Sequence, residues 1–274
     1  MQKSKRKETA RRCLNILSEG FYINQKAQRI DIHPLQHAAV DGTILYTPDK
    51  LHVLLADERP KPAFGTEFVV NDLTTLDSVR AEYPADNRVL CLNFASARNP
   101  GGGFLKGSQA QEESIARATG LYPCLLKAEE YYVANRRHPS CIYTDHIIYA
   151  PDVPVLMDED GNLLEKPITT TIITAPAVNT GVVMRQESDK IDEIVPRMRQ
   201  RIDMVLAISL AQKHQTLVLG AWGCGVFRND PIVIAGLFHE LLTGKYVGQF
   251  RRVVFSVYAR DERFIRPFQD QFSF

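Results

Sequence analysis

The chain has 274 residues and is close to neutral, with 33 Lys and Arg against 32 Asp and Glu. Its composition is that of a globular protein, since 45% of the residues are hydrophobic and 24% are charged. The near-zero balance argues against a dedicated duplex-DNA binder, which would carry a basic excess. The charge is unevenly spread, because residues 1–12 hold six basic groups and one acid.

No stretch approaches the roughly 18 uninterrupted apolar residues of a membrane span, and the N-terminus lacks the apolar core of a secretory signal. The five cysteines are widely spaced and form no CxxC pair, which favours a reducing compartment over a disulfide framework or a zinc site. His138 and His146 have no further ligand at metal-binding spacing. We expect a cytoplasmic protein (or a nuclear one in a eukaryote) without membrane contact, metal or cofactor.

The first segment predicts an amphipathic helix over residues 3–19, with Gly20 as its stop signal. Residues 21–65 contain short apolar pieces interrupted by prolines. We predict that residues 1–65 are an extension packed on a main unit of residues 66–274, the two forming one structure. The basic front of the helix is an ordinary solvated face, a site that attracts an anionic polymer, or a nuclear-targeting signal.

From Thr66 onward, buried strands alternate with helices, a pattern that indicates a sheet between two layers of helices. The predicted strands are residues 67–70, 88–94, 146–150, 170–175, 216–219 and 251–257. The predicted helices are residues 76–82, 108–134, 190–213 and 231–243. The acidic sequence of residues 158–162 predicts an exposed turn.

Two glycine-rich loops each follow a predicted strand and precede a predicted helix, where ligands bind in open α/β sheets. The first loop, residues 93–103, ends in Gly101, Gly102 and Gly103, which allow close backbone approach to a ligand. We expect the next helix to begin near Ser108 with a capping box. Gln111, Glu112 and Glu113 would then lie in its first turn and point back towards the glycines.

The second loop, residues 220–229, leads into a helix start at Asp230-Pro231. Gly223 and Gly225 suit a nest of backbone N–H groups for an anion, next to a helix dipole that favours phosphate. Neither loop is a Walker or a GxGxxG sequence. A diphosphate site beside paired carboxylates favours acid/base chemistry on a nucleotide sugar.

Simpler interpretations exist for each of these residues. The two glutamates could be ordinary first-turn acids favoured by the helix dipole. Trp222 and Phe227 could be core residues, as we expect for Tyr131 and Tyr132. Cys224 has no neighbouring base, so a catalytic thiol is not favoured.

Gly101–Gly103, seven intervening residues and Gln111-Glu112-Glu113 resemble the GGG-x(6–8)-QEE signature of poly(ADP-ribose) glycohydrolases. The blocks KETARRCLNIL, TDHIIYAPDVPV and LVLGAWGCGVFRNDP also resemble the compact bacterial type of this family. The resemblance covers nearly the whole chain from about residue 7. It implies a macrodomain-like α/β fold: a three-layer α/β/α sandwich with a mixed central sheet and an N-terminal helical extension.

The resemblance implies that Glu113 is the catalytic acid/base and that Glu112 orients the scissile ribose. In this family one carboxyl is thought to protonate the leaving oxygen and then activate the water. Adjacent helical residues point about 100° apart, which disfavours a pair flanking the bond as in ordinary glycosidases.

The resemblance also assigns substrate binding. Asn99 would contact the distal ribose, the signature positions Gly101, Gly102, Gly103 and Gln111 would shape the catalytic loop, and Asp72 is a loose match for an adenine-reading acid. The diphosphate loop would consist of Gly223, Cys224, Gly225, Val226 and Phe227, with Phe227 stacking near the sugar or adenine.

The implied function is hydrolysis of ribose–ribose bonds in poly(ADP-ribose), mainly from chain ends, with release of ADP-ribose. The partners would be poly(ADP-ribose), ADP-ribose and poly(ADP-ribosyl)ated proteins, without sequence-specific nucleic acid. Two alternatives stay open. One is a non-catalytic macrodomain reader of ADP-ribose, which would have no need of the intact QEE. The other is a hydrolase of mono-ADP-ribosylated protein or nucleic acid.

Overall fold

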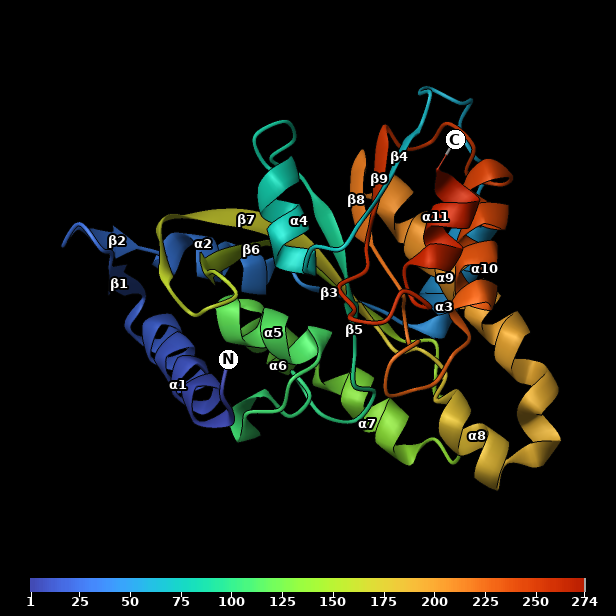
Figure 1. The fold of residues 1–274 in the computed structure, drawn as a ribbon, viewed down its shortest axis with the longest axis horizontal. Helices are drawn as coiled ribbons and strands as arrows, with labels where there is room; N and C mark the ends of the chain where they lie inside the picture. Colours follow the sequence, from blue (N-terminus) through green and yellow to red (C-terminus); the bar gives the residue numbers. More distant parts are fainter. Residues whose placement is uncertain (274) are drawn as a thin grey trace.

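One mixed sheet organises the molecule, and the computed structural model describes residues 1–273 (Figure 1). Its strands lie in the order β3 (Ile44–Tyr46), β6 (Ile147–Met157), β7 (Leu163–Ala175), β5 (Leu90–Phe94), β8 (Thr216–Leu219), β9 (Arg252–Ser256) and β4 (Glu67–Asn71). The strands from β7 to β4 pair in parallel, whereas β6 is antiparallel to both β3 and β7. All six predicted strands are therefore present, and β6 and β7 are longer than predicted.

Helices cover both faces of this sheet, which confirms the three-layer prediction (Figure 1). One face carries α3 (Pro48–Ala56), α9 (Ile194–Ala211), α10 (Pro231–Thr243) and α11 (Arg266–Phe272). The other carries α1 (Lys3–Glu19), α2 (His33–Asp41), α4 (Thr75–Glu82), α5 (Gln111–Ala118), α6 (Leu121–Lys127) and α7 (Glu129–Arg137). Successive strand residues alternate between the two cores: Leu217 and Leu219 pack on one side and Val218 on the other.

Residues 1–65 take part in this architecture through α1, α2, α3 and β3. The strand β3 extends the edge of the main sheet beside β6. A separate hairpin of β1 (Phe21–Ile23) and β2 (Arg29–Asp31) follows α1. The helix α1 packs against α5 through Ala10 and Ala116, with Phe104 between them. Among residues 1–273 no helix has the length and apolarity needed to cross a membrane.

The single helix predicted over residues 108–134 is wrong, because this segment forms α5, α6 and α7. Thr119 separates the first two, with extended backbone (φ −134°, ψ 167°) and a β-bridge to Val155. The tertiary pairing with β6 thus overrides local helix propensity. The helix predicted over residues 190–213 is nearly right, but it begins as the 3-10 helix η2 (Ser188–Glu193) before α9.

Candidate active site

The two glycine-rich loops meet at one edge of the sheet because β5 and β8 are parallel neighbours. The first loop leaves the end of β5 and the second leaves the end of β8. A cleft of about 610 Å³ lies between them, lined by Glu112 and Glu113 on one side and by residues 221–227 on the other. The predicted convergence of the two loops is therefore confirmed, at the carboxyl ends of parallel strands.

The N-terminus of α5 is fixed to the sheet by Gln111. Its Oε1 accepts a hydrogen bond from Phe94 N (2.8 Å), and its Nε2 donates to Leu92 O (2.7 Å) and Thr75 Oγ1 (3.1 Å). Both ends of the amide are thus committed to protein partners. Gln111 positions the two glutamates that follow it, in addition to lining the cleft.

The predicted helix start at Ser108 is wrong, because α5 begins at Gln111 after an extended Ala110 without a side-chain cap. The buried Arg117 explains the difference. Its guanidinium donates to Ser108 O (2.8 Å) and to Gln109 Oε1 (2.8 Å), which holds residues 108–109 outside the helix. This contact comes from the far end of α5, so the local sequence gives no signal for it.

Glu112 is buried, with 3% of its surface exposed. Its Oε2 accepts a hydrogen bond from Ser96 N (2.7 Å), and its Oε1 lies 3.4 Å from Asn93 Nδ2. Burial raises the pKa of this carboxyl to about 8, against the lowering effect of the Ser96 N–H. Glu112 is therefore held between these two donors, and burial favours its neutral form.

Glu113 is half-buried at the cleft, and its Oε1 accepts a hydrogen bond from Gly103 N (2.9 Å). The glycines make this approach possible. Gly102 has φ +59°, and a Cβ there would lie 2.5 Å from Glu113 Oε1 and 2.9 Å from Glu112 Oε2. Gly102 thus packs directly against both carboxylates and leaves no room for a side chain, while close approach of this loop to a ligand stays a prediction.

Both carboxyl groups converge on Gly102. An inverting glycosidase separates its two carboxyls by about 6.5–9.5 Å across the substrate, which this convergence does not provide. A buried and protonated Glu112 is also a poor nucleophile. The geometry favours one acid/base, Glu113, with Glu112 as a positioning group.

The diphosphate loop presents a row of unused donors. Within residues 1–273 the backbone N–H groups of Gly225, Val226 and Phe227 have no acceptor. The carbonyl of Phe227 is held by Gly181 N (3.0 Å) at the start of α8 (Thr180–Gln186). Three consecutive free amides form a nest suited to an anion.

The N-cap predicted at Asp230 is confirmed, while the contribution of the helix dipole to phosphate binding stays a prediction. The side chain of Asp230 caps α10 by accepting from Ile232 N (2.8 Å), so this helix end already carries an anionic group. No Lys or Arg is among the described residues that line the cleft. A diphosphate here would depend on loop amides, which is compatible with the small net charge of the chain.

The remaining loop residues divide between core and cleft. Trp222 is fully buried in the core and also borders the cleft, and Phe227 lines the cleft with its ring centroid 6.1 Å from that of Tyr143. Burial raises the pKa of the Cys224 thiol to about 12, which excludes a ready nucleophile. The side chain of Val226, which also lines the cleft, is 82% exposed.

Two predicted contacts lie outside this cleft. Asn99 is exposed on the catalytic loop, where its carbonyl accepts from Gly102 N (3.0 Å). Asp72 is exposed beyond the end of β4 and is not among the lining residues. Their roles at the distal ribose and at adenine stay predictions. Within residues 1–273 no three His, Cys, Asp or Glu side chains gather in a way that could hold a metal ion.

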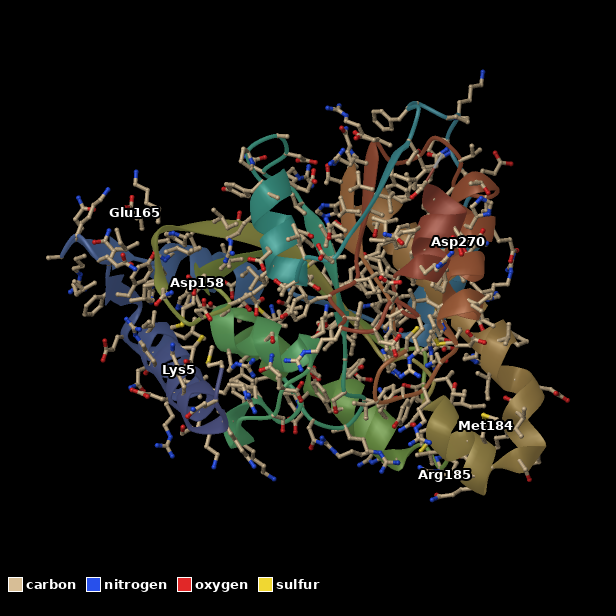
Figure 2. All side chains as sticks on the ribbon, viewed as in Figure 1. Lys5, Asp158, Glu165, Met184, Arg185 and Asp270 are labelled. Atoms are coloured by element: carbon tan, nitrogen blue, oxygen red, sulfur yellow. The ribbon has the colours of Figure 1, made fainter. Side chains whose placement is uncertain are left out.

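The turn between β6 and β7 supplies a cleft residue that the sequence analysis missed. Figure 2 labels Asp158 at the start of this turn. Asp160 and Asn162 are exposed as predicted, but Glu159 is half-buried and lines the cleft. The turn packs closely against α1, since a Cβ on Gly161 would lie 2.9 Å from Thr9 Oγ1. Only this long-range packing reveals the position of Glu159.

Asn229 is a second residue that the sequence analysis missed, because it acts within the fold of the diphosphate loop. Its buried amide donates to Val178 O (2.8 Å) and Gly223 O (3.1 Å) and accepts from Thr180 Oγ1 (2.9 Å). Asn229 thereby links Gly223 within the diphosphate loop to the segment of residues 178–180.

The two loop glycines should respond differently to alanine. At Gly223, where φ is +75°, a Cβ would lie 2.5 Å from Ala177 Cβ, so Gly223→Ala should destabilise the fold by about 1–3 kcal/mol. At Gly225 no atom lies within 4 Å, so Gly225→Ala should unfold like the wild type and lose affinity for ADP-ribose. Thermal unfolding and ADP-ribose titration measure the two effects. Unchanged affinity in Gly225→Ala would show that a ligand does not approach this amide closely.

The fold and the site together define a class. A macrodomain-like sandwich holds free loop amides at one end of a cleft and a glutamate pair at the other. This is the arrangement of an ADP-ribose-binding protein with glycosidase chemistry.

Comparisons with known proteins agree with this class. The family model for the microbial-type PARG catalytic domain, where PARG is poly(ADP-ribose) glycohydrolase, matches residues 10–158. The PARG structure from Thermomonospora curvata is 40% identical, with a TM-score of 0.93, over 97% of this chain and 99% of that chain. The chain belongs to the microbial-type poly(ADP-ribose) glycohydrolase family, which confirms the resemblance in its sequence.

Several solved structures of relatives contain ligands. The Thermomonospora curvata enzyme bound to the inhibitor ADP-HPD is 40% identical, covering 98% of each chain with a TM-score of 0.88. The Deinococcus radiodurans enzyme in complex with ADP-ribose is 42% identical, covering 86% of this chain and 96% of that chain with a TM-score of 0.83. No curated protein sequence matches the chain.

Proposed function

We propose that this chain hydrolyses the ribose–ribose bonds of poly(ADP-ribose) from chain ends and releases ADP-ribose. The observation that carries this proposal is the position of Glu113, which lines the same cleft as the free amides of residues 225–227. A terminal ADP-ribose with its diphosphate on those amides would extend towards the carboxyl pair. The natural substrates would be poly(ADP-ribosyl)ated proteins.

The reaction follows from the chemistry of the glycosidic bond. The Glu113 carboxyl gives its proton to the leaving ribose oxygen as the bond from that oxygen to the anomeric carbon breaks. Water then attacks the anomeric carbon and gives a proton back to the Glu113 carboxylate. The neutral Glu112 hydrogen-bonds a ribose hydroxyl and orients the anomeric carbon towards Glu113.

A panel of substrates tests the proposal. Wild type is incubated with long poly(ADP-ribose), with a mono-ADP-ribosylated protein and with mono-ADP-ribosylated nucleic acid, and the products are separated by size. Steady release of ADP-ribose from the polymer is expected. Turnover of only the single-unit substrates would overturn the assignment, and binding of ADP-ribose without any turnover would indicate a reader. Early appearance of oligomers would contradict cleavage from chain ends.

We place this reaction in a reducing, cytoplasmic compartment. All five cysteines are free, and four of them are buried. Such thiols persist where glutathione keeps cysteines reduced. Fractionation of cells that express the tagged chain would test this placement.

A further inference from the structure

The N-terminal turns of α1 lie directly against the catalytic loop. Gly107, with φ +74°, ends the 3-10 helix η1 (Phe104–Lys106), and a Cβ there would lie 2.7 Å from Lys3 O and 2.9 Å from Lys7 Cγ. The side chain of Arg6 donates to Gly107 O (2.8 Å). The most basic segment of the chain is thus docked beside the loop that carries the three glycines.

Four exposed cations lie on α1 and on the adjoining η1. We call them the basic rim: Lys3, Lys7, Arg11 and Lys106. The first three recur every four residues and so share one stripe of α1. Within residues 1–273 none of the four forms a salt bridge. The exposed acid on these turns is Glu8, so the rim keeps a clear positive excess.

Only a few residues separate the basic rim from Glu113. Gly103 N donates to Glu113 Oε1, η1 follows immediately, and Gly107 then contacts α1. Glu113 and the free amides of residues 225–227 line the same cleft. A polymer chain that leaves Glu113 on the side of the catalytic loop would therefore pass the rim.

We propose that the basic rim binds the part of poly(ADP-ribose) beyond the scissile bond, the chain that departs as the leaving alcohol. This inference rests on the proposed function. Each unit of the departing chain carries an anionic diphosphate, and cations beside its path attract it through a salt-dependent interaction. The rim gives long polymers an advantage that free ADP-ribose, which ends at the scissile bond, does not share.

The same helix supplies a matched control. Lys5 and Arg12 are also exposed on α1, where Figure 2 labels Lys5, and helical spacing places both on the side opposite Lys3 and Lys7. The pair Lys3→Gln/Lys7→Gln and the pair Lys5→Gln/Arg12→Gln change the net charge equally. Glutamine keeps the helix propensity of lysine and the Cγ that packs over Gly107.

Binding is measured in the Glu113→Gln background at low salt with three labelled ligands: long poly(ADP-ribose), free ADP-ribose and polyadenylate. The Lys3/Lys7 pair is expected to weaken polymer binding about threefold to tenfold, with a smaller salt dependence and unchanged ADP-ribose binding. The Lys5/Arg12 pair should leave all three affinities close to the background values.

Equal losses from both pairs would mean general charge attraction and would overturn the proposal. Unchanged polymer binding in the Lys3/Lys7 pair would also overturn it, as would an equal loss of polyadenylate binding, which would identify a nucleic-acid surface. Wild-type turnover is measured separately. A chain that binds polymer through the rim without cutting it would refute the proposed function and leave the rim assignment standing.

Discussion

Glu113→Gln is expected to lower ADP-ribose release from poly(ADP-ribose) by about 10²–10⁴-fold, the usual contribution of a general acid–base group. Glutamine can neither give a proton to the leaving oxygen nor take one from water. Its amide oxygen can still accept from Gly103 N, where Glu113 Oε1 accepts at 2.9 Å. The loss should therefore appear in kcat, with KM and ADP-ribose affinity near the wild-type values.

The matched control for this variant is Glu129→Gln, the same chemical change at an exposed acid in the first turn of α7. It should keep wild-type turnover. Full release of ADP-ribose by Glu113→Gln, with binding intact, would remove Glu113 from the mechanism. A large fall in melting temperature together with the loss of rate would instead indicate that the carboxylate mainly supports the catalytic loop.

The parts of the site that the sequence predicted are those encoded locally. Each glycine loop directly follows a buried strand, and parallel strands end at the same edge of a sheet. The order of elements alone therefore placed the two loops at the same edge of the sheet. The first-turn position of Glu112 and Glu113 was predicted from short spacing in the same way, even though the predicted helix start was three residues too early.

The parts that sequence reasoning missed depend on contacts between distant segments. Arg117 keeps Ser108 out of α5, and the bridge of Thr119 to Val155 interrupts the long predicted helix. Glu159 enters the cleft because its turn packs on α1. Asp230, in contrast, was placed correctly as the N-cap of α10, because the sequence Asp230-Pro231 encodes this helix start locally.

Glu112→Gln should change how stability depends on pH. Burial raises the pKa of Glu112 from 4.5 to about 8, so folding opposes ionisation of this group. Its contribution to stability is fully present below pH 4.5 and is lost as the pH rises towards 8. Glutamine does not ionise. Relative to wild type, Glu112→Gln should therefore gain on the order of 5 kcal/mol between pH 4 and pH 9.

The surroundings of Glu112 can accept this change. A glutamine oxygen replaces Oε2 as the acceptor from Ser96 N, and its NH₂ group would face Asn93. The Oδ1 atom of Asn93 is buried without a partner, so a turn of that amide provides the acceptor. Denaturant unfolding of both proteins across this pH range measures the difference. Parallel curves would show that Glu112 is ionised in the folded protein.

The same substitution separates positioning from proton transfer. Because glutamine resembles a protonated carboxyl, Glu112→Gln should keep more turnover than Glu112→Ala, which removes the contact to the ribose altogether. Both should exceed Glu113→Gln if Glu113 alone handles the proton. A Glu112→Gln protein as inactive as Glu113→Gln, with normal ADP-ribose binding, would mean that the proton held by Glu112 at neutral pH is the one delivered to the leaving oxygen. Glu112 would then be the general acid, and Glu113 would activate the water.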